Sequence, residues 1–300
     1  INLLAHMDLA ALHYEWNELE RSDTHLHKAL TLCLPSHNDE FLAGCCLMES
    51  SLRIAQGNLA GAEAALDKVG AQASAGKISP SMAARLEAAR VHLLLVKGEP
   101  VEEWHHRLVE TADFHPFYRF LGVTKAWTMP ESKAQAYLAE MSKIALANEW
   151  TYGLVAARAF QAALAQTQAE ALGYLTEALN VAESGGFVRT FVDLGKKLIP
   201  HLRAAAARGI HPAYGERIYS ASLGETAQSH PSQETLIEPL SEREREVLCL
   251  IARGASNQEI AEDLTIALTT AKKHISNIIG KLGASNRVQA VARARELGLL

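Results

Sequence analysis

The chain has 300 residues, of which 48% are hydrophobic and 6% aromatic, and a formal net charge of −5. This length suffices for one large or two modest domains with buried cores. No apolar run reaches the roughly 20 residues that span a bilayer, so we expect no membrane partner. The start carries no secretory-signal pattern, and because the first residue is Ile1 rather than Met we expect a fragment of a longer protein.

Charge is distributed unevenly along the chain. Residues 239–300 contain nine Lys or Arg and seven Asp or Glu, a net of +2, whereas the preceding residues contain 20 basic and 27 acidic side chains, a net of −7. A basic segment suits phosphates and an acidic one repels them, so the two parts are expected to have different tasks. The four cysteines show no CxxC spacing, which indicates a reducing, cytoplasmic setting.

Residues 1–219 are predicted to form a TPR-like helical-repeat domain. Abundant alanine favours helix, and short turns near Asn17, Gly57 and Gly98 recur after 40 and 41 residues. A less regular continuation passes Pro130 and Gln166. Helix pairs that repeat every 34 to 47 residues or so are typical of TPR-like or HEAT-like superhelices. A helical bundle without repeats is the alternative.

The end of this region is less regular. Segment 185–195, GGFVRTFVDLG, breaks the helical pattern, and Gly185 and Gly186 can end a helix there. The next helix, KKLIPHLRAAAARG, is expected to be interrupted at Pro200. Residues 220–238 are rich in Ser, Thr and Gln and predict a flexible linker.

Aromatic and histidine side chains of the repeat region are candidates for a ligand or metal site. The tryptophans are expected to be core residues more often than a stacking platform for a ligand; they are Trp16, Trp104, Trp127 and Trp150. His115, Phe117 and Tyr118 are candidates for a ligand groove. The histidine pairs lack metal-site spacing, so we expect histidines on polar helix faces and no metal.

Residues 239–300 predict a compact helical domain. Ser241 with Glu244, and Ser256 with Glu259, both have the S-x-x-E spacing of a capping box, so two short helices are expected to begin there. A third helix is predicted over 268–282. Its buried face comprises the apolar residues at steps of three and four, which are Leu268, Ala271, Ile275, Ile278 and Leu282.

The opposite face of the third helix is polar and carries lysines, which suits entry into the DNA major groove. The candidate DNA-binding residues are Asn257, Thr269, Thr270, Lys272, Lys273, His274, Ser276, Asn277 and Lys281. Lys272, Lys273 and Ser276 can reach base edges or phosphates, and Thr269 lies on the same polar face. The other candidates are expected to contact flanking phosphates. The alternative is a solvated helix face.

The motifs PLSERE, VLCLIARGASNQEIAEDL, TTAKKHISNI and KLGASNR resemble the DNA-binding domain of LuxR-type transcription regulators. The resemblance implies a four-helix domain, with Asn257 to Ser276 as the helix-turn-helix and a fourth helix after Asn286 that can form a dimer contact. Two departures are Ala267, where the family has a Ser or Thr cap, and Ala271, where Val is usual.

The whole chain resembles the C-terminal part of MalT-like, ATP-dependent LuxR regulators. The resemblance implies that the superhelix receives an inducer and that ATP is bound by a separate N-terminal module. No G-x-x-x-x-G-K-[ST] loop occurs in this sequence, so no cofactor is expected in this chain.

The prediction is therefore an all-α protein: a TPR-like superhelix (1–219), a linker (220–238) and a four-helix LuxR-type helix-turn-helix domain (239–300). We expect a cytoplasmic, bacterial, sequence-specific transcription regulator, an activator by family habit, that binds double-stranded promoter DNA. Further expected partners are an inducer or protein on the repeats, RNA polymerase, and a second copy of the chain. A TPR-like scaffold without DNA binding is the alternative, and a helical-repeat enzyme is disfavoured because no nucleophile or metal site stands out.

Overall fold

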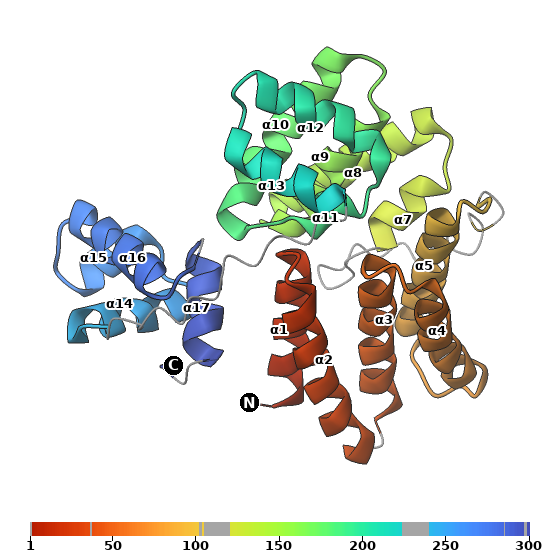
Figure 1. The fold of residues 1–300 in the computed structure, drawn as a ribbon, viewed down its shortest axis with the longest axis horizontal. Helices are drawn as coiled ribbons and strands as arrows, with labels where there is room; N and C mark the ends of the chain where they lie inside the picture. Colours follow the sequence, from red (N-terminus) through yellow and green to blue (C-terminus); the bar gives the residue numbers. More distant parts are fainter. Residues whose placement is uncertain are drawn as a thin grey trace. The chain divides into compact units, whose positions relative to one another are not determined.

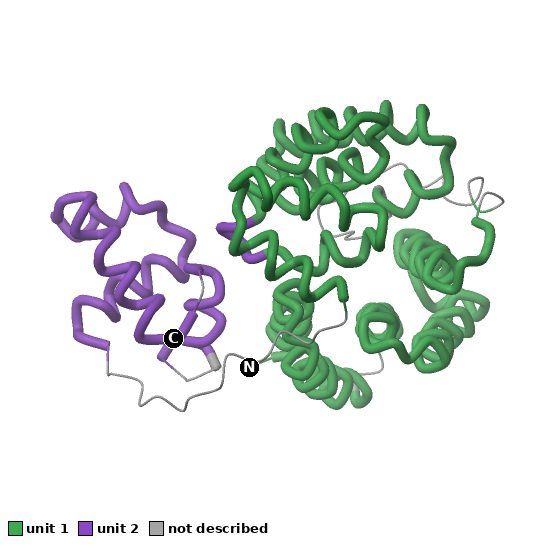
Figure 2. Tube along the Cα trace, turned by 45° about the horizontal axis from the view of Figure 1, so that its top comes forward, with its two compact units in different colours: residues 1–182, 187–227 green, residues 183–186, 228–300 purple. Residues whose placement is uncertain are grey.

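The computed structural model describes residues 2–36, 38–101, 104, 121–223, 240–284, 286–296 and 299–300. Within these ranges all regular structure is helical, which confirms the all-α prediction. The chain forms two compact units, one of residues 1–182 with 187–227 and one of residues 183–186 with 228–300 (Figure 2).

The first part of the chain consists of helix hairpins (Figure 1). Its helices are α1 (Leu3–Glu15), α2 (Leu19–Cys33), α3 (Asp39–Ala55), α4 (Leu59–Ser74), α5 (Pro80–Lys97), α7 (Leu121–Trp127), α8 (Glu131–Ala147), α9 (Thr151–Leu164), α10 (Gln168–Gly185), α11 (Arg189–Val192), α12 (Ile199–Ala207) and α13 (Pro212–Ser222). The helices pack in sequential pairs, α1 with α2, α3 with α4, α8 with α9 and α12 with α13, as a repeat array requires.

The predicted turns coincide with left-handed backbone. Asn17 has φ 61°, and Gly57 and Gly98 both have φ 76°. Glycine adopts this region without steric cost, and asparagine tolerates it better than most residues. The recurrence of these residue types therefore located the ends of helices α1, α3 and α5 correctly from the sequence.

The tryptophans are core residues, as predicted. Trp16 is almost fully buried, and Trp127 and Trp150 pack against the large core cluster of helices α7 to α13. Trp104 packs against the smaller cluster around Val101. The proposed ligand groove of residues 115–118 lies outside the described residues.

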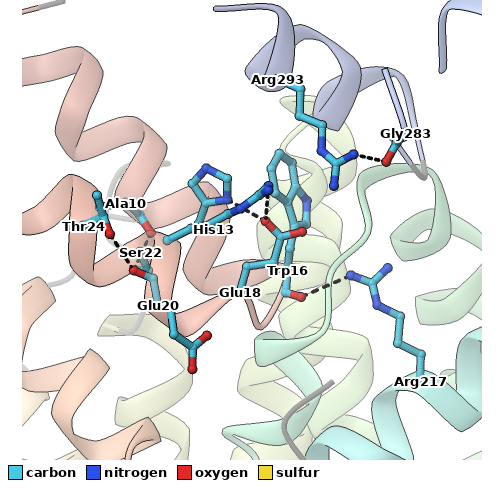
Figure 3. A network of polar contacts seen from close by, with 11 residues as sticks. Ala10, His13, Trp16, Glu18, Glu20, Ser22, Thr24, Arg217, Gly283 and Arg293 are labelled. Carbon is cyan, nitrogen blue, oxygen red and sulfur yellow. Dashed lines mark hydrogen bonds and ion pairs between the residues drawn. The ribbon is translucent and has the colours of Figure 1, made fainter. Parts of the chain in front are cut away.

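The histidine prediction is wrong for several side chains, which are buried rather than on polar faces. His6 and His25 lie between α1 and α2 with their Nδ1 atoms 2.9 Å apart, and the His13 ring stacks on that of His25. His13 also contacts the Glu18 carboxylate at 2.7 Å (Figure 3). His92 on α5 is buried as well. Helix packing thus uses imidazoles as core side chains that retain a hydrogen-bond partner.

A cluster of buried polar contacts joins the end of α1 to the segment after α10; we call it the clasp and define it by Tyr14, Glu15, Arg189, Thr190 and Asp193. Glu15 accepts hydrogen bonds from the backbone N–H and the hydroxyl of Thr190, and Tyr14 donates to Asp193 at 2.9 Å. Arg189 is ion-paired with Asp193. The clasp therefore holds the first helix of the repeat unit to its last helices.

Neighbouring contacts reinforce the clasp. The Arg189 guanidinium also donates to Asn17, and Arg217 of α13 donates to the carbonyl of Trp16 at 3.1 Å (Figure 3). The backbone N–H of Val188 donates to the carbonyl of Glu15 at 2.9 Å. These contacts link residues more than 170 positions apart in the sequence.

Two local predictions need correction. Pro200 does not interrupt a helix but lies in the first turn of α12, where its missing N–H removes no helical hydrogen bond. The predicted linker begins inside a helix, because α13 continues through Ser222. Residues 224–238, which make up the rest of that linker, lie outside the described residues.

The C-terminal part of the second unit contains four helices in its described residues, as predicted: α14 (Glu242–Ala252), α15 (Asn257–Asp263), α16 (Leu268–Lys281) and α17 (Arg287–Glu296). Its core is aliphatic and draws on all four helices, with Val247, Ile260, Ile278 and Ala290 completely buried. The apolar residues of α16 therefore pack into this core, and most of its polar face lies exposed to solvent.

Candidate nucleic-acid interface

Both predicted capping boxes are present and fix the starts of α14 and α15. Ser241 Oγ accepts from the backbone N–H of Glu244, whose carboxylate accepts from the N–H of Ser241 at 2.8 Å. Ser256 and Glu259 repeat this exchange at the start of α15. Reciprocal capping satisfies backbone donors that a helix start otherwise leaves open. It thus sets where α15, the first helix of the helix-turn-helix, begins.

A short turn joins α15 to α16. Thr265 adopts φ 53° in this turn, and the N–H of Ile266 donates to the carbonyl of Ala261 at 2.9 Å. A guanidinium nitrogen of Arg243 donates to the carbonyl of Leu264 at 2.6 Å, so α14 also supports the turn. Left-handed backbone is strained for a β-branched residue, and its presence here is compensated by these contacts.

The buried face of α16 follows the predicted spacing except at its first residue. Ala271 and Ile278 are completely buried, and Ile275 and Leu282 nearly so. Leu268, predicted on the same face, is instead 41% exposed. A helical side chain covers the turn that precedes its own Cα, and no such turn precedes the first residue of a helix.

The opposite face of α16 presents most of the predicted DNA-binding side chains to solvent. Those exposed are Thr269, Thr270, Lys272, Lys273, Ser276 and Asn277, and His274 is half-buried. All seven lie on one helix of 14 residues. The structure therefore brings these predicted residues together on one element.

Lys272 and Lys273 make no ion pair with any residue that the structure describes. The other predicted lysine differs, because the Lys281 ammonium lies 2.8 Å from the buried carboxylate of Glu244. The hydrogen bond from Lys281 lowers the pKa of Glu244, with further help from Ser241. Lys281 thus has a structural role in tying α16 to the start of α14.

Two arginines of the basic C-terminal segment also serve the fold. Arg287 donates to the carbonyl of Ala255 at 2.7 Å, and Arg293 donates to the carbonyl of Leu282 at 2.9 Å. Figure 3 shows Arg293 beside the carbonyl of Gly283 as well. Net charge alone did not distinguish these structural cations from the exposed lysines of α16, since that distinction depends on tertiary contacts.

Asn257 is the first residue of α15 and is half-buried. Its side-chain oxygen is buried and accepts no hydrogen bond from the described residues. The predicted contact between Asn257 and a DNA phosphate remains a prediction.

The start of α16 lacks a side-chain cap. Ala267 occupies the N-cap position with extended backbone, φ −67° and ψ 145°, and no side chain bonds to the first turn. Neither Thr269 nor Thr270 therefore replaces the missing cap.

The described residues contain no group of three or more His, Cys, Asp or Glu side chains placed to hold a metal ion. None of the described helices combines the length and apolar composition needed to cross a membrane.

A helical-repeat array joined in one chain to a capped helix-turn-helix with an exposed lysine-bearing helix defines a regulator of the DNA-binding class. Comparisons with known proteins agree: residues 1–208 match the family described as "MalT-like TPR region", and residues 238–294 match "Bacterial regulatory proteins, luxR family". The chain belongs to the MalT-like regulators of the LuxR family.

Individual relatives give the same result. The chain is 34% identical over 150 residues to the HTH-type transcriptional regulator MalT of Klebsiella pneumoniae, a match that covers 43% of this chain and 17% of that protein. It is 32% identical over 152 residues to MalT of Serratia proteamaculans, covering 44% and 17%. The matched region thus spans less than one fifth of the length of these relatives.

Proposed function

We propose that this chain regulates transcription by reading a promoter sequence with the exposed face of α16. The observation that carries the proposal is the pair Lys272 and Lys273, which is exposed and free of ion pairs with the described residues, whereas Lys281 is bound to Glu244. A helix fits the major groove, and lysine donates to the O6 and N7 acceptors of guanine or to phosphates. Placing these two lysines against DNA therefore breaks no ion pair with the residues that the structure describes.

Each exposed side chain of α16 has a role in this proposal. Lys272, Lys273 and Ser276 face the base edges, and Thr269, Thr270 and Asn277 contact phosphates on either side of the groove. His274 is half-buried and reaches a phosphate only from the edge of the helix. Lys281 is left out of the DNA-facing set because it holds Glu244.

The repeat unit supplies the regulatory input in this proposal. It receives an inducer or a protein partner, and the signal controls whether two copies of the chain place their recognition helices on two half-sites. As a further part of the proposal, the chain activates transcription through contact with RNA polymerase in the cytoplasm of a bacterium. ATP is not bound by this chain in this scheme.

Fluorescence anisotropy tests the DNA-binding proposal. The full chain is titrated against promoter and random duplexes at several salt concentrations. Affinity is expected to fall steeply with salt, because counterions are released, and to differ between duplexes. Lys272→Ala or Lys273→Ala is expected to cost about 1–3 kcal/mol if that lysine reads a base.

A matched control is Lys143→Ala, since Lys143 is a highly exposed lysine of α8 in the first unit. The affinity of this variant for each duplex should equal that of the unchanged chain. If both α16 variants bind as well as this control, the assigned face is wrong. If the full chain and residues 239–300 alone both fail to bind at low salt, the scaffold alternative is favoured.

A further inference from the structure

Leu268 is an exposed leucine at the start of α16, the helix that the proposed function places in the major groove and that we call the recognition helix. It is the first residue of α16 and is 41% exposed, whereas Ala271 and Ile278 on the buried face are completely covered. Nothing in the core of the second unit requires an apolar side chain at this exposed position, since Leu268 is not part of that core.

Helix geometry places Leu268 beside the lysine-bearing face. Successive residues turn by about 100° around the axis, so Leu268 lies about 40° from Lys272 and about 20° from the buried Ile275. Leu268 thus occupies the border between the two faces, one turn before Lys272. It continues the exposed face toward the N-terminal end of α16.

That end of a recognition helix is the part that reaches base edges in helix-turn-helix complexes. Ala267, which precedes Leu268, is also apolar and carries no capping group. The side chains of Ala267 and Leu268 therefore offer carbon at the leading end of α16, whereas the hydroxyl groups begin at Thr269. Among the four base pairs, the group that matches carbon in the major groove is the 5-methyl of thymine.

We infer that Leu268 is a specificity-determining residue that packs on the 5-methyl group of a thymine next to the base pair contacted by Lys272. The inference rests on the proposed DNA-binding function and adds to it an apolar reading element. Lysine and serine at 272, 273 and 276 supply hydrogen bonds, and Leu268 supplies discrimination of thymine from cytosine at one position.

A methyl scan tests the inference with the full chain. The preferred duplex is selected from random sequences, and each of its thymines is then replaced singly by deoxyuridine, which removes only the 5-methyl group. We expect one position per half-site at which this change weakens binding about four-fold, because burying one methyl-sized group changes a binding constant by about that factor. Leu268→Ala should weaken binding to the thymine duplex by a similar factor and remove the sensitivity at that position.

The control variant is Leu146→Ala, because Leu146 is a 57% exposed leucine of α8. Replacing thymine by deoxyuridine should weaken DNA binding by this variant as much as it weakens binding by the unchanged chain. Far-UV circular dichroism should show that Leu268→Ala folds, since alanine is a better helix former than leucine.

Two results overturn the inference while leaving DNA binding intact: a flat methyl scan, or the same methyl sensitivity in Leu268→Ala as in the unchanged chain. If no duplex is bound in a salt-dependent way, the proposed function itself fails and the inference fails with it. The two failures are therefore distinguishable.

Discussion

The carboxylate of Glu15, at the end of α1, accepts two hydrogen bonds from Thr190, which lies 175 residues further along the chain. The donors are the backbone N–H at 2.8 Å and the hydroxyl at 2.7 Å. Buried carboxylates persist in proteins when such donors replace the lost water. Glu15 therefore joins the first helix of the repeat unit to α11.

Disrupting the clasp should destabilise the first unit. Asp193→Ala leaves the guanidinium of Arg189 buried without its carboxylate, which we expect to cost about 3–5 kcal/mol. Burial by itself would lower the pKa of this arginine, and the Asp193 carboxylate outweighs that effect and raises it. Urea unfolding followed by tryptophan fluorescence measures the loss, because all four tryptophans precede residue 151 and so report on the first unit.

The control for the clasp is the exposed pair of Glu140 and Lys143, whose side chains are 60% and 74% exposed. Glu140→Ala should change stability by less than about 0.5 kcal/mol, because exposed pairs contribute little. If Asp193→Ala shifts the urea midpoint no further than Glu140→Ala does, the clasp is not a stabilising contact.

Stability of the first unit should also fall in mild acid. Burial lowers the pKa of His6 and of His92 below the ordinary value of 6.5, so the folded protein holds these imidazoles neutral. The unfolded chain binds protons near pH 6.5 and the folded chain only at lower pH. The stabilisation is thus fully present above about pH 6.5 and is lost as the pH falls toward the folded pKa values.

The urea midpoint of the tryptophan transition, measured from pH 7.5 down to 5.5, should therefore decrease. A His6→Gln, His92→Gln double variant should show a shallower dependence on pH, whatever its absolute stability. An unchanged slope in that variant would assign the acid sensitivity to other groups, such as the half-buried His201, whose pKa is also lowered by burial.

Local features of this fold were predictable from the sequence, whereas long-range ones were not. The capping box at Ser241 and the turn at Gly57 depend on residues within a few positions of each other. The clasp depends on Glu15 and Thr190, which no periodicity connects. For Lys281, the pattern of charges showed a basic residue on a helix but not the carboxylate that binds it.

Restoring the missing cap should stabilise the second unit. Ala267 already has the extended backbone of an N-cap, so Ala267→Ser can accept a hydrogen bond from the first turn without rearrangement. We expect a gain of about 1 kcal/mol. Hydrogen exchange of peptides from α16, measured in the full chain, reports this gain in stability as increased protection of their amide protons.

The reciprocal change is Ser256→Ala, which removes an existing capping box and should decrease protection of α15 by a comparable free energy. If Ala267→Ser leaves exchange in α16 unchanged while Ser256→Ala lowers it in α15, the start of α16 is stabilised by contacts other than capping.

Lys272 and Lys281 lie on the same helix but should respond oppositely to substitution. Lys281→Ala leaves the buried Glu244 carboxylate without its cation, so it should reduce hydrogen-exchange protection of α14 by about 1–3 kcal/mol. Lys272→Ala removes an exposed side chain and should change that protection by less than about 0.5 kcal/mol, while weakening DNA binding.

Measuring both properties on both variants separates the two roles. At a temperature where each variant is folded, Lys281→Ala should bind DNA nearly as well as the unchanged chain, and Lys272→Ala should not. The opposite result, lower affinity in Lys281→Ala with unchanged protection of α14, would mean that Lys281 leaves Glu244 to contact a phosphate. In that case DNA and the capping box of α14 would compete for one ammonium group, and raising the salt concentration should weaken DNA binding more steeply in the unchanged chain than in Lys281→Ala.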